Sequence, residues 1–234
     1  MQQVLLILPV VAPVLFWAAY HYHKDRHLPE PPGNLLLCLA LGFVAAAISK
    51  GFYLALDPVG LRFDAVGLAE DRPVALLIYA LLAIGPIEEL AKMLPFLVVV
   101  LRFRAFDEPL DGIIYASFIA LGYAAVENYH YLAYLNELEA VARGFAGPVI
   151  HILFASIWAH WVTRAHLARR SVLKAAALGF LVAAALHGLY DFLVLRQPVA
   201  ALPIAAVLIG IIWVWRLRLM RDMQADAGRR AQES

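Results

Sequence analysis

Long apolar runs alternate with short polar segments along almost the whole chain. A helix that crosses a bilayer needs about 20 mostly apolar residues, and its ends are usually marked by charged residues or by proline and glycine. Seven runs fit this description, at about 4–21, 34–56, 74–101, 112–135, 146–163, 174–195 and 199–219. The pattern therefore predicts an all-α protein, a polytopic transmembrane helical bundle of about seven transmembrane helices.

Composition strengthens this prediction and removes several classes of function. Of the 234 residues, 63% are hydrophobic and only 16% are charged, and the mean hydropathy of +0.75 exceeds what a water-soluble domain needs for its core. The formal net charge of +1 provides no general attraction to nucleic acid, so we expect no nucleic-acid partner. The single cysteine, Cys38, excludes an internal disulfide, and we expect no disulfide partner.

The apolar runs show no internal repeat that would divide the chain. We expect a single transmembrane helical domain over residues 1–220 and a frayed polar cytoplasmic tail over 221–234. The first run begins without basic residues, so we interpret it as a retained helix rather than a cleaved signal peptide.

Basic residues are distributed unequally between the two sets of connecting segments. Positive segments remain in the cytoplasm, so this bias predicts an external N-terminus and a cytoplasmic C-terminus. Four basic residues belong to the external set: Arg62, Arg72, Arg143 and Arg196. Thirteen belong to the cytoplasmic set: Lys24, Arg26, Arg102, Arg104, Arg164, Arg169, Arg170, Lys174, Arg216, Arg218, Arg221, Arg229 and Arg230.

The most informative residues are polar ones inside the runs, because one charge at the bilayer centre costs roughly 2.5–3.5 kcal/mol. Four different runs carry such residues: Glu88, Glu89, Lys92, Glu127, Asn128, His151, His187 and Asp191. At about 1.5 Å per residue, the two adjacent glutamates lie at the centre of their run, whereas the later acids and histidines lie roughly 3–9 Å outside the centre of theirs. A shared layer of this kind predicts one polar cavity that opens outward.

The adjacent Glu88 and Glu89 can both border that cavity, because neighbouring helical residues point about 100° apart. Lys92 follows at helical spacing and can neutralise one of the carboxylates. The like charges should then share a proton, and either glutamate could take a proton from water. Pro86 and Pro95 should bend the helix around them.

Glu127, His151 and His187 offer the donor types of a hydrolytic zinc site with an open position, although no HExxH helix holds them. The same side chains could also act without metal, with histidines donating to an oxyanion. A proton-coupled transporter or channel with a midplane Glu/His cavity is the alternative function. Lys50, inside the second run, has no assigned role.

The polar motifs occur in a fixed order between about residues 85 and 195. They are Glu88-Glu89-x-x-Lys92, Asp111-Gly112-x-x-Tyr115, Gly122-Tyr123-Ala124-Ala125-Val126-Glu127-Asn128, His151-x-x-Phe154 and His187-Gly188. This combination resembles the PrsW family of intramembrane proteases, relatives of the CAAX-prenyl endoproteases and the bacteriocin-processing membrane proteins.

The resemblance implies an intramembrane endopeptidase that cuts a single-pass membrane protein, such as an anti-sigma factor, on the extracytoplasmic side. It implies that Glu88 and Glu89 supply the water-activating acid and that Glu127 is a second acid or a ligand. His151 and His187 would be ligands or oxyanion donors. With zinc, the metal ligands would be Glu127, His151 and His187.

Three further residues would support the catalytic ones: Lys92, Asn128 and Asp191. Asp191 lies one helical turn from His187, so its place as a partner of that histidine rests on geometry rather than on the family pattern. The expected location is the inner (plasma) membrane of a bacterial cell, with lipid as a further partner.

Overall fold

A computed structural model describes residues 2–24, 29–195 and 201–233, with side chains for 8–24, 29–195 and 202–225. Within these residues every regular element is a helix. The long helices are α1 (Gln2–Lys24), α2 (Pro32–Leu56), α5 (Gly85–Val98), α6 (Pro109–Tyr131), α7 (Glu137–Leu167), α8 (Val172–Leu195) and α9 (Ala201–Glu233). The shorter elements are η1 (Asp57–Val59), α3 (Ala65–Asp71), α4 (Pro73–Tyr79), the π-helical turn η2 (Ala80–Ile84) and η3 (Val100–Arg102).

Within the described residues, each of the seven apolar runs lies mainly on a long helix or on a continuous series of helices; the run 112–135 continues a few residues past the end of α6. In the part of the chain that the structure describes, six segments are long and apolar enough to cross a membrane, and one of them, Pro73–Arg102, combines α4, η2, α5 and η3. The remaining run, 4–21, lies within α1, whose side chains before Leu8 are outside the described part. The predicted polytopic helical bundle is confirmed, and the chain is a multi-pass membrane protein.

Two helices extend beyond the apolar runs. α7 begins at Glu137 rather than near 146, because Asn136 and Glu139 form a capping box that starts the helix in polar sequence. α9 continues to Glu233, through most of the tail that we expected to be frayed. Hydropathy marks the part of a helix that can lie in lipid and not where its backbone hydrogen bonds end.

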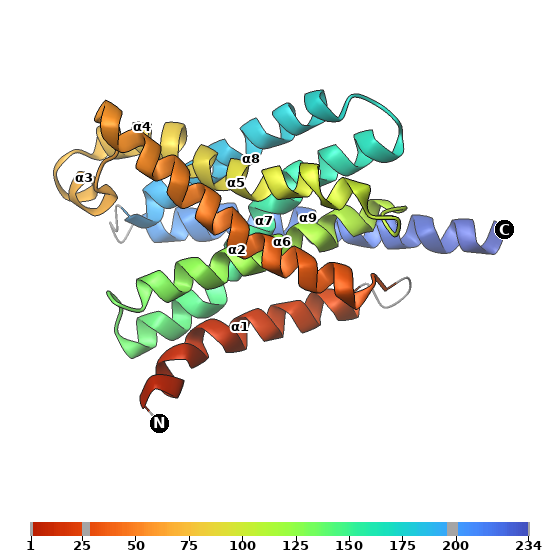
Figure 1. Cartoon of the computed structure of the whole chain (residues 1–234), viewed down its shortest axis with the longest axis horizontal. Coiled ribbons are helices and arrows are strands. Elements are labelled where there is room, and N and C mark those ends of the chain that lie inside the picture. Colours follow the sequence, from red (N-terminus) through yellow and green to blue (C-terminus); the bar gives the residue numbers. More distant parts are fainter. Residues whose placement is uncertain (1, 25–28, 196–200, 234) are drawn as a thin grey trace.

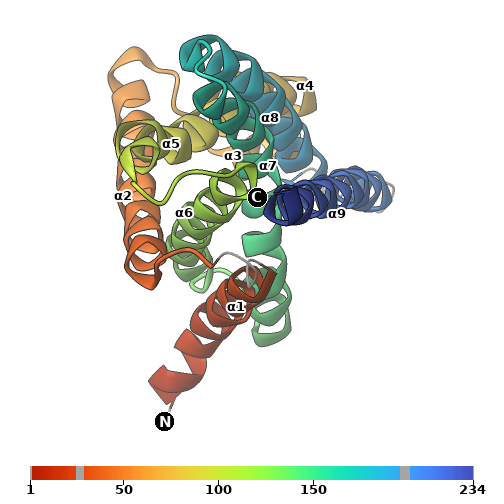
Figure 2. The ribbon, with the colours of Figure 1, turned by 90° about the vertical axis from the view of Figure 1, so that its right-hand side faces the viewer.

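α6 and α7 form the centre of the bundle, with the other long helices around them (Figures 1 and 2). In the most apolar 18-residue stretch of α6, 83% of the residues are buried, whereas in the corresponding stretch of α9 the share is 17%. The N-terminus and the C-terminus lie toward opposite ends of the long axis (Figure 1). Because α6 and α7 are central, a residue on either helix can face neighbours on several other helices.

Arg216 differs from the role that the charge count gave it. It is 2% exposed in the middle of α9, and its guanidinium donates to Ser156 Oγ of α7 at 2.8 Å and to Ser117 Oγ of α6 at 3.0 Å. It joins three helices instead of marking a cytoplasmic surface, and twelve basic residues remain against four. Arg26 and Arg196 lie outside the described residues, as do the side chains of residues 229 and 230.

Glycines allow the span that carries Glu88 and Glu89 to approach α8 closely. A Cβ added to Gly85 would lie 2.2 Å from the backbone oxygen of Ala184, and one added to Gly188 would lie 2.3 Å from that of Ala80. Small residues permit this kind of backbone contact between membrane helices. Since Gly188 follows His187 directly, the contact brings that histidine to the glutamates.

We predict that Gly85→Ala and Gly188→Ala destabilise the protein by about 1–3 kcal/mol, because backbone atoms must move to make room. Gly51→Ala and Gly210→Ala are matched controls, since a Cβ at either position meets no atom within 4 Å. The controls should stabilise slightly, as Ala is the better helix former. Thermal unfolding in detergent measures all four variants. Equal behaviour of the two pairs would contradict the close-contact argument.

Candidate active site

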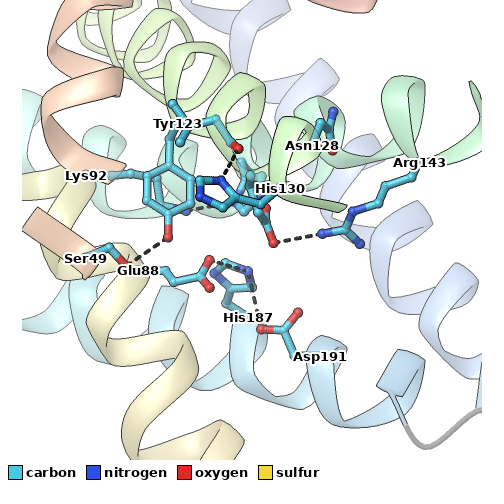
Figure 3. Close-up of polar contacts among 12 residues, drawn as sticks. Ser49, Glu88, Lys92, Tyr123, Asn128, His130, Arg143, His187 and Asp191 are labelled. Atoms are coloured by element: carbon cyan, nitrogen blue, oxygen red, sulfur yellow. Dashed lines mark hydrogen bonds and ion pairs between the residues drawn. The ribbon is translucent and has the colours of Figure 1, made fainter. Parts of the chain in front are cut away.

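The structure brings the predicted polar residues of four helices into one cluster (Figure 3). α5 contributes Glu88, Glu89 and Lys92, and α6 contributes Glu127. His151 lies on α7, and His187 and Asp191 lie on α8; Arg143 of α7, which the sequence analysis did not place among them, joins the same cluster. The shared depth of the residues along the sequence thus corresponds to contact in space.

Local backbone geometry places the two glutamates. Pro86 has no N–H to donate to the preceding turn, and the π-helical turn η2 lies just before it, ending where α5 begins. The span therefore continues through the proline by a wider turn. Both Glu88 and Glu89 are buried in the first part of α5.

Glu89 has both of its carboxylate oxygens occupied. Oε1 accepts from Lys92 Nζ at 2.6 Å and lies 2.7 Å from His187 Nδ1, and Oε2 accepts from Trp158 Nε1 at 2.8 Å. Glu89 and Lys92 are both 0% exposed. A carboxylate beside an imidazole nitrogen fixes which nitrogen carries the proton, so His187 donates from Nδ1 and Nε2 remains for other contacts.

Glu88 is in the opposite situation. Its Oε2 is buried without a hydrogen-bond partner, and its Oε1 lies 3.4 Å from the hydroxyl of Tyr53 on α2. His187 Nε2 is 3.7 Å from Glu88 Oε2 and 3.6 Å from Asp191 Oδ2. An unsatisfied buried carboxylate oxygen is costly unless a proton, a water molecule or a cation completes it.

Glu127 connects the cluster to its more exposed side. One of its oxygens accepts from Arg143 Nη2 at 2.8 Å, and the other is in close contact with His151 Nε2. The side chains of Glu127 and Arg143 are 22% and 29% exposed. On the opposite side of the imidazole, Lys92 Nζ lies 3.1 Å from His151 Nδ1.

Among the described residues, one group could hold a metal ion: Glu88, His151 and His187, whose ligand atoms lie within 4.8 Å of one another. This group shares the two histidines of the predicted trio but contains Glu88 where the sequence suggested Glu127. The physical difference is that both Glu127 oxygens already have partners, whereas Glu88 has an oxygen to give.

The donor set suits zinc, which binds histidine nitrogen and carboxylate oxygen. Charge supports the same conclusion. The cluster holds four carboxyl groups, and within the described residues the lysine and arginine side chains paired with them are Lys92 and Arg143. A divalent cation would balance the remaining negative charge.

Two other predicted residues have different environments. Asn128 donates to the Gly144 carbonyl at 3.4 Å and so links α6 to α7 instead of facing the histidines. Lys50 is exposed on α2. Neither His130, which contacts the backbone of its own helix, nor His160 joins the cluster.

Three residues of the cluster were missed by the sequence analysis. Arg143 lies in the part of α7 that the apolar run did not include, although the capping box at Asn136 could have revealed the earlier start. Trp158 follows His151 by two helical turns, so it shares that face, but tryptophan is common in packing. Tyr53 carries no distinguishing sequence signal.

The fold and the cluster define a class: a multi-pass helical membrane protein with acidic, basic and histidine side chains gathered between its helices. A family model described as "PrsW family intramembrane metalloprotease" matches residues 30–216. No solved structure matches the chain.

Curated proteins named Protease PrsW are similar over most of the chain. The one from Oceanobacillus iheyensis is 30% identical over 219 residues, covering 89% of this chain and 92% of that protein. Those from Geobacillus kaustophilus (32%, covering 80% and 78%) and Clostridioides difficile (28%, covering 89% and 87%) are comparable. The chain belongs to the PrsW family and is a peptidase.

The buried Glu89–Lys92 pair generates a prediction about stability. Lys92→Met should cost about 3–5 kcal/mol, because it leaves the Glu89 charge buried with no cation beside it. The double variant Glu89→Gln/Lys92→Met removes both charges and should lose less. Lys50→Met, at an exposed lysine of α2, is the control and should change stability by no more than about 0.5 kcal/mol. Thermal unfolding in detergent compares the three variants. A double variant that is less stable than Lys92→Met alone would contradict the ion-pair argument.

Proposed function

We propose that this peptidase is an intramembrane endopeptidase that cleaves a single-pass membrane protein, of the anti-sigma-factor type, near the extracytoplasmic side. The observation that supports this most is the buried cluster itself, in which a carboxylate with an unused oxygen lies beside two histidines. Peptide hydrolysis needs a base for water and donors for the oxyanion, and the cluster and its neighbour Tyr53 offer candidates for both.

The proposed division of roles follows from which oxygens are occupied. Glu89, with both oxygens held, orients His187 and balances Lys92. Glu88, His151 and His187 would hold zinc. Zinc in such sites supplies Lewis-acid polarisation of water and of a carbonyl group.

Glu127 is then the carboxylate that takes the proton from water and returns it to the leaving amine. It is partly exposed, so solvent reaches it, and it touches His151. The Tyr53 hydroxyl, beside Glu88, is placed to donate to the developing oxyanion.

One contact favours a metal-free variant of this mechanism. The Lys92 ammonium can only donate, so His151 accepts at Nδ1 and its neutral ring carries the proton on Nε2, toward Glu127. A protonated ring nitrogen does not bind metal. In that variant both ring protons are directed to carboxylates, so the Tyr53 hydroxyl donates to the oxyanion, and Glu88, through its unused oxygen, takes the proton from water.

For orientation we propose an external N-terminus and a cytoplasmic C-terminus in the inner membrane of a bacterial cell, with one transmembrane domain over 1–220. The twelve-to-four excess of basic residues supports this arrangement. The cluster would then lie slightly outside the midplane. A helical amide is shielded by its own hydrogen bonds, so the substrate must present an unwound segment at that depth.

We predict that cells with the wild-type chain contain a shortened single-pass membrane protein that is absent with Glu88→Gln or Glu127→Gln. Glutamine keeps the shape but can neither take a proton from water, the role of Glu127, nor serve as the carboxylate ligand, the role of Glu88, so cleavage should fall at least about 100-fold. Comparison of the membrane proteomes measures this. Glu70→Gln, at an exposed glutamate of α3, is the matched control.

The new terminus of the fragment reports the side of cleavage. A cut on the extracytoplasmic side agrees with the proposed orientation, and a cut in the cytoplasm contradicts it. Full cleavage by both Gln variants would remove the carboxylate mechanism.

The metal proposal predicts that purified protein contains about one equivalent of zinc and that a membrane-permeant chelator stops cleavage. Glu88→Gln and His151→Ala should lose the metal, whereas Glu127→Gln should keep it while being inactive. Elemental analysis distinguishes these cases. Active protein with less than about a tenth of an equivalent of transition metal would exclude zinc and select the metal-free variant. Metal lost in Glu127→Gln but kept in Glu88→Gln would instead make Glu127 the ligand.

A further inference from the structure

Arg143 reaches the candidate site from the early part of α7. Its Nη2 lies 2.8 Å from Glu127 Oε1, and Figure 3 shows the guanidinium extending toward the cluster from one side. The sequence analysis assigned Arg143 to the basic residues of the external segments and did not predict this contact. The two side chains are 29% and 22% exposed, so the pair belongs to the more accessible part of the cluster, whereas Glu89 and Lys92 are 0% exposed.

A second contact fixes the guanidinium independently of Glu127. Its central carbon lies 3.5 Å from the centre of the Tyr131 ring. Tyr131 follows Glu127 by four residues on α6, so both side chains lie on one face of that helix. Arg143 is therefore stacked on one residue of this face and hydrogen-bonded to the other, which leaves it little freedom to move.

This arrangement determines how the carboxylate of Glu127 is oriented. With Oε1 held by Arg143, rotation about the carboxylate bond is restricted, and Oε2 faces His151. A free carboxylate would exchange its oxygens and swing toward solvent. We infer that Arg143 is a positioning residue that holds Glu127 against His151 for catalysis. The inference rests on the proposed function of the cluster and adds a residue to it.

The chemistry of the guanidinium makes the inference specific. Its planar group can stack on a ring and donate in its plane at once, whereas a lysine ammonium offers a point charge without the stacked geometry. Arg143→Lys should therefore be slower than wild type even though it keeps the charge. Arg143→Ala removes both contacts and opens a space in the accessible part of the cluster that a small guanidinium ion can enter.

The test measures how fast isolated membranes form the fragment that wild type produces and Glu88→Gln does not. Arg143→Ala should be slower by about 10–100-fold, the usual effect of removing a residue that orients a reacting group. Guanidinium chloride should restore part of the rate, and sodium chloride at equal concentration should not. Guanidinium should not accelerate Glu127→Gln or the double variant Arg143→Ala/Glu127→Gln, because the group it would position is absent.

Arg62→Ala is the matched control. Arg62 also pairs with a carboxylate, Asp57 at 2.6 Å, but both are about half exposed in the loop after α2. Its loss should leave the rate unchanged. Thermal unfolding of the purified full chain shows whether Arg143→Ala is folded, and if it is not, a folded Arg143→Lys must still be slower than wild type.

The outcomes separate this inference from the function on which it rests. If wild type forms no fragment, or Glu88→Gln and Glu127→Gln form it as well as wild type does, the proposed function is wrong. If those Gln variants are inactive but Arg143→Ala and Arg143→Lys cleave at the wild-type rate, only the role of Arg143 is wrong. A folded, slow Arg143→Ala that guanidinium does not accelerate would also overturn the positioning role.

Discussion

The carboxylate of Glu89 is enclosed where α5, α7 and α8 meet, and the arrangement of the cluster depends on how it is satisfied. A buried charge in a membrane protein is tolerated only with partners, and here an ammonium, an indole and an imidazole supply them. Each partner comes with a consequence. Lys92 lies beside His151, His187 carries its proton on Nδ1, and Trp158 connects α7 to the same carboxylate. The neighbouring Glu88 is thereby left as the carboxylate with a free oxygen.

This polar centre is possible because the surrounding helices approach one another closely. Hydrophobic burial contributes little to the association of helices in lipid, because lipid tails are as apolar as the side chains. Close packing and hydrogen bonds between helices must therefore stabilise the bundle. Gly85 and Gly188 bring α5 to α8, while Arg216 and two serines join α9 to the central helices at another depth. The polar cluster of the candidate site and the contacts of Arg216 are thus separate networks within one bundle.

The sequence predicted the spans well and the cluster in outline. Long apolar runs have few alternatives to membrane helices, and the cost of burying charge makes Glu88, His151 and His187 conspicuous. Which oxygen meets which donor depends on the rotation of four helices about their axes, and apolar residues on all sides of a helix leave that rotation undefined. For this reason the sequence could not tell whether Glu88 or Glu127 joins the two histidines in the group that could hold a metal ion. Arg216 was misjudged because the rule for orientation counts charges and not their burial.

The π-helical turn before α5 determines which face of that helix is turned toward α8. A turn of this kind contains one residue more than a regular helical turn. The side chains after it are therefore rotated by about 100° about the helix axis, compared with their positions in an uninterrupted α-helix. Without that extra residue, α5 would continue in the same place but present a different side to α8. Glu89 would turn away from His187 and toward another part of the bundle. The face that α5 presents to α8 is therefore determined by the preceding stretch of five apolar residues, Ala80–Ile84, none of which has an ionisable side chain.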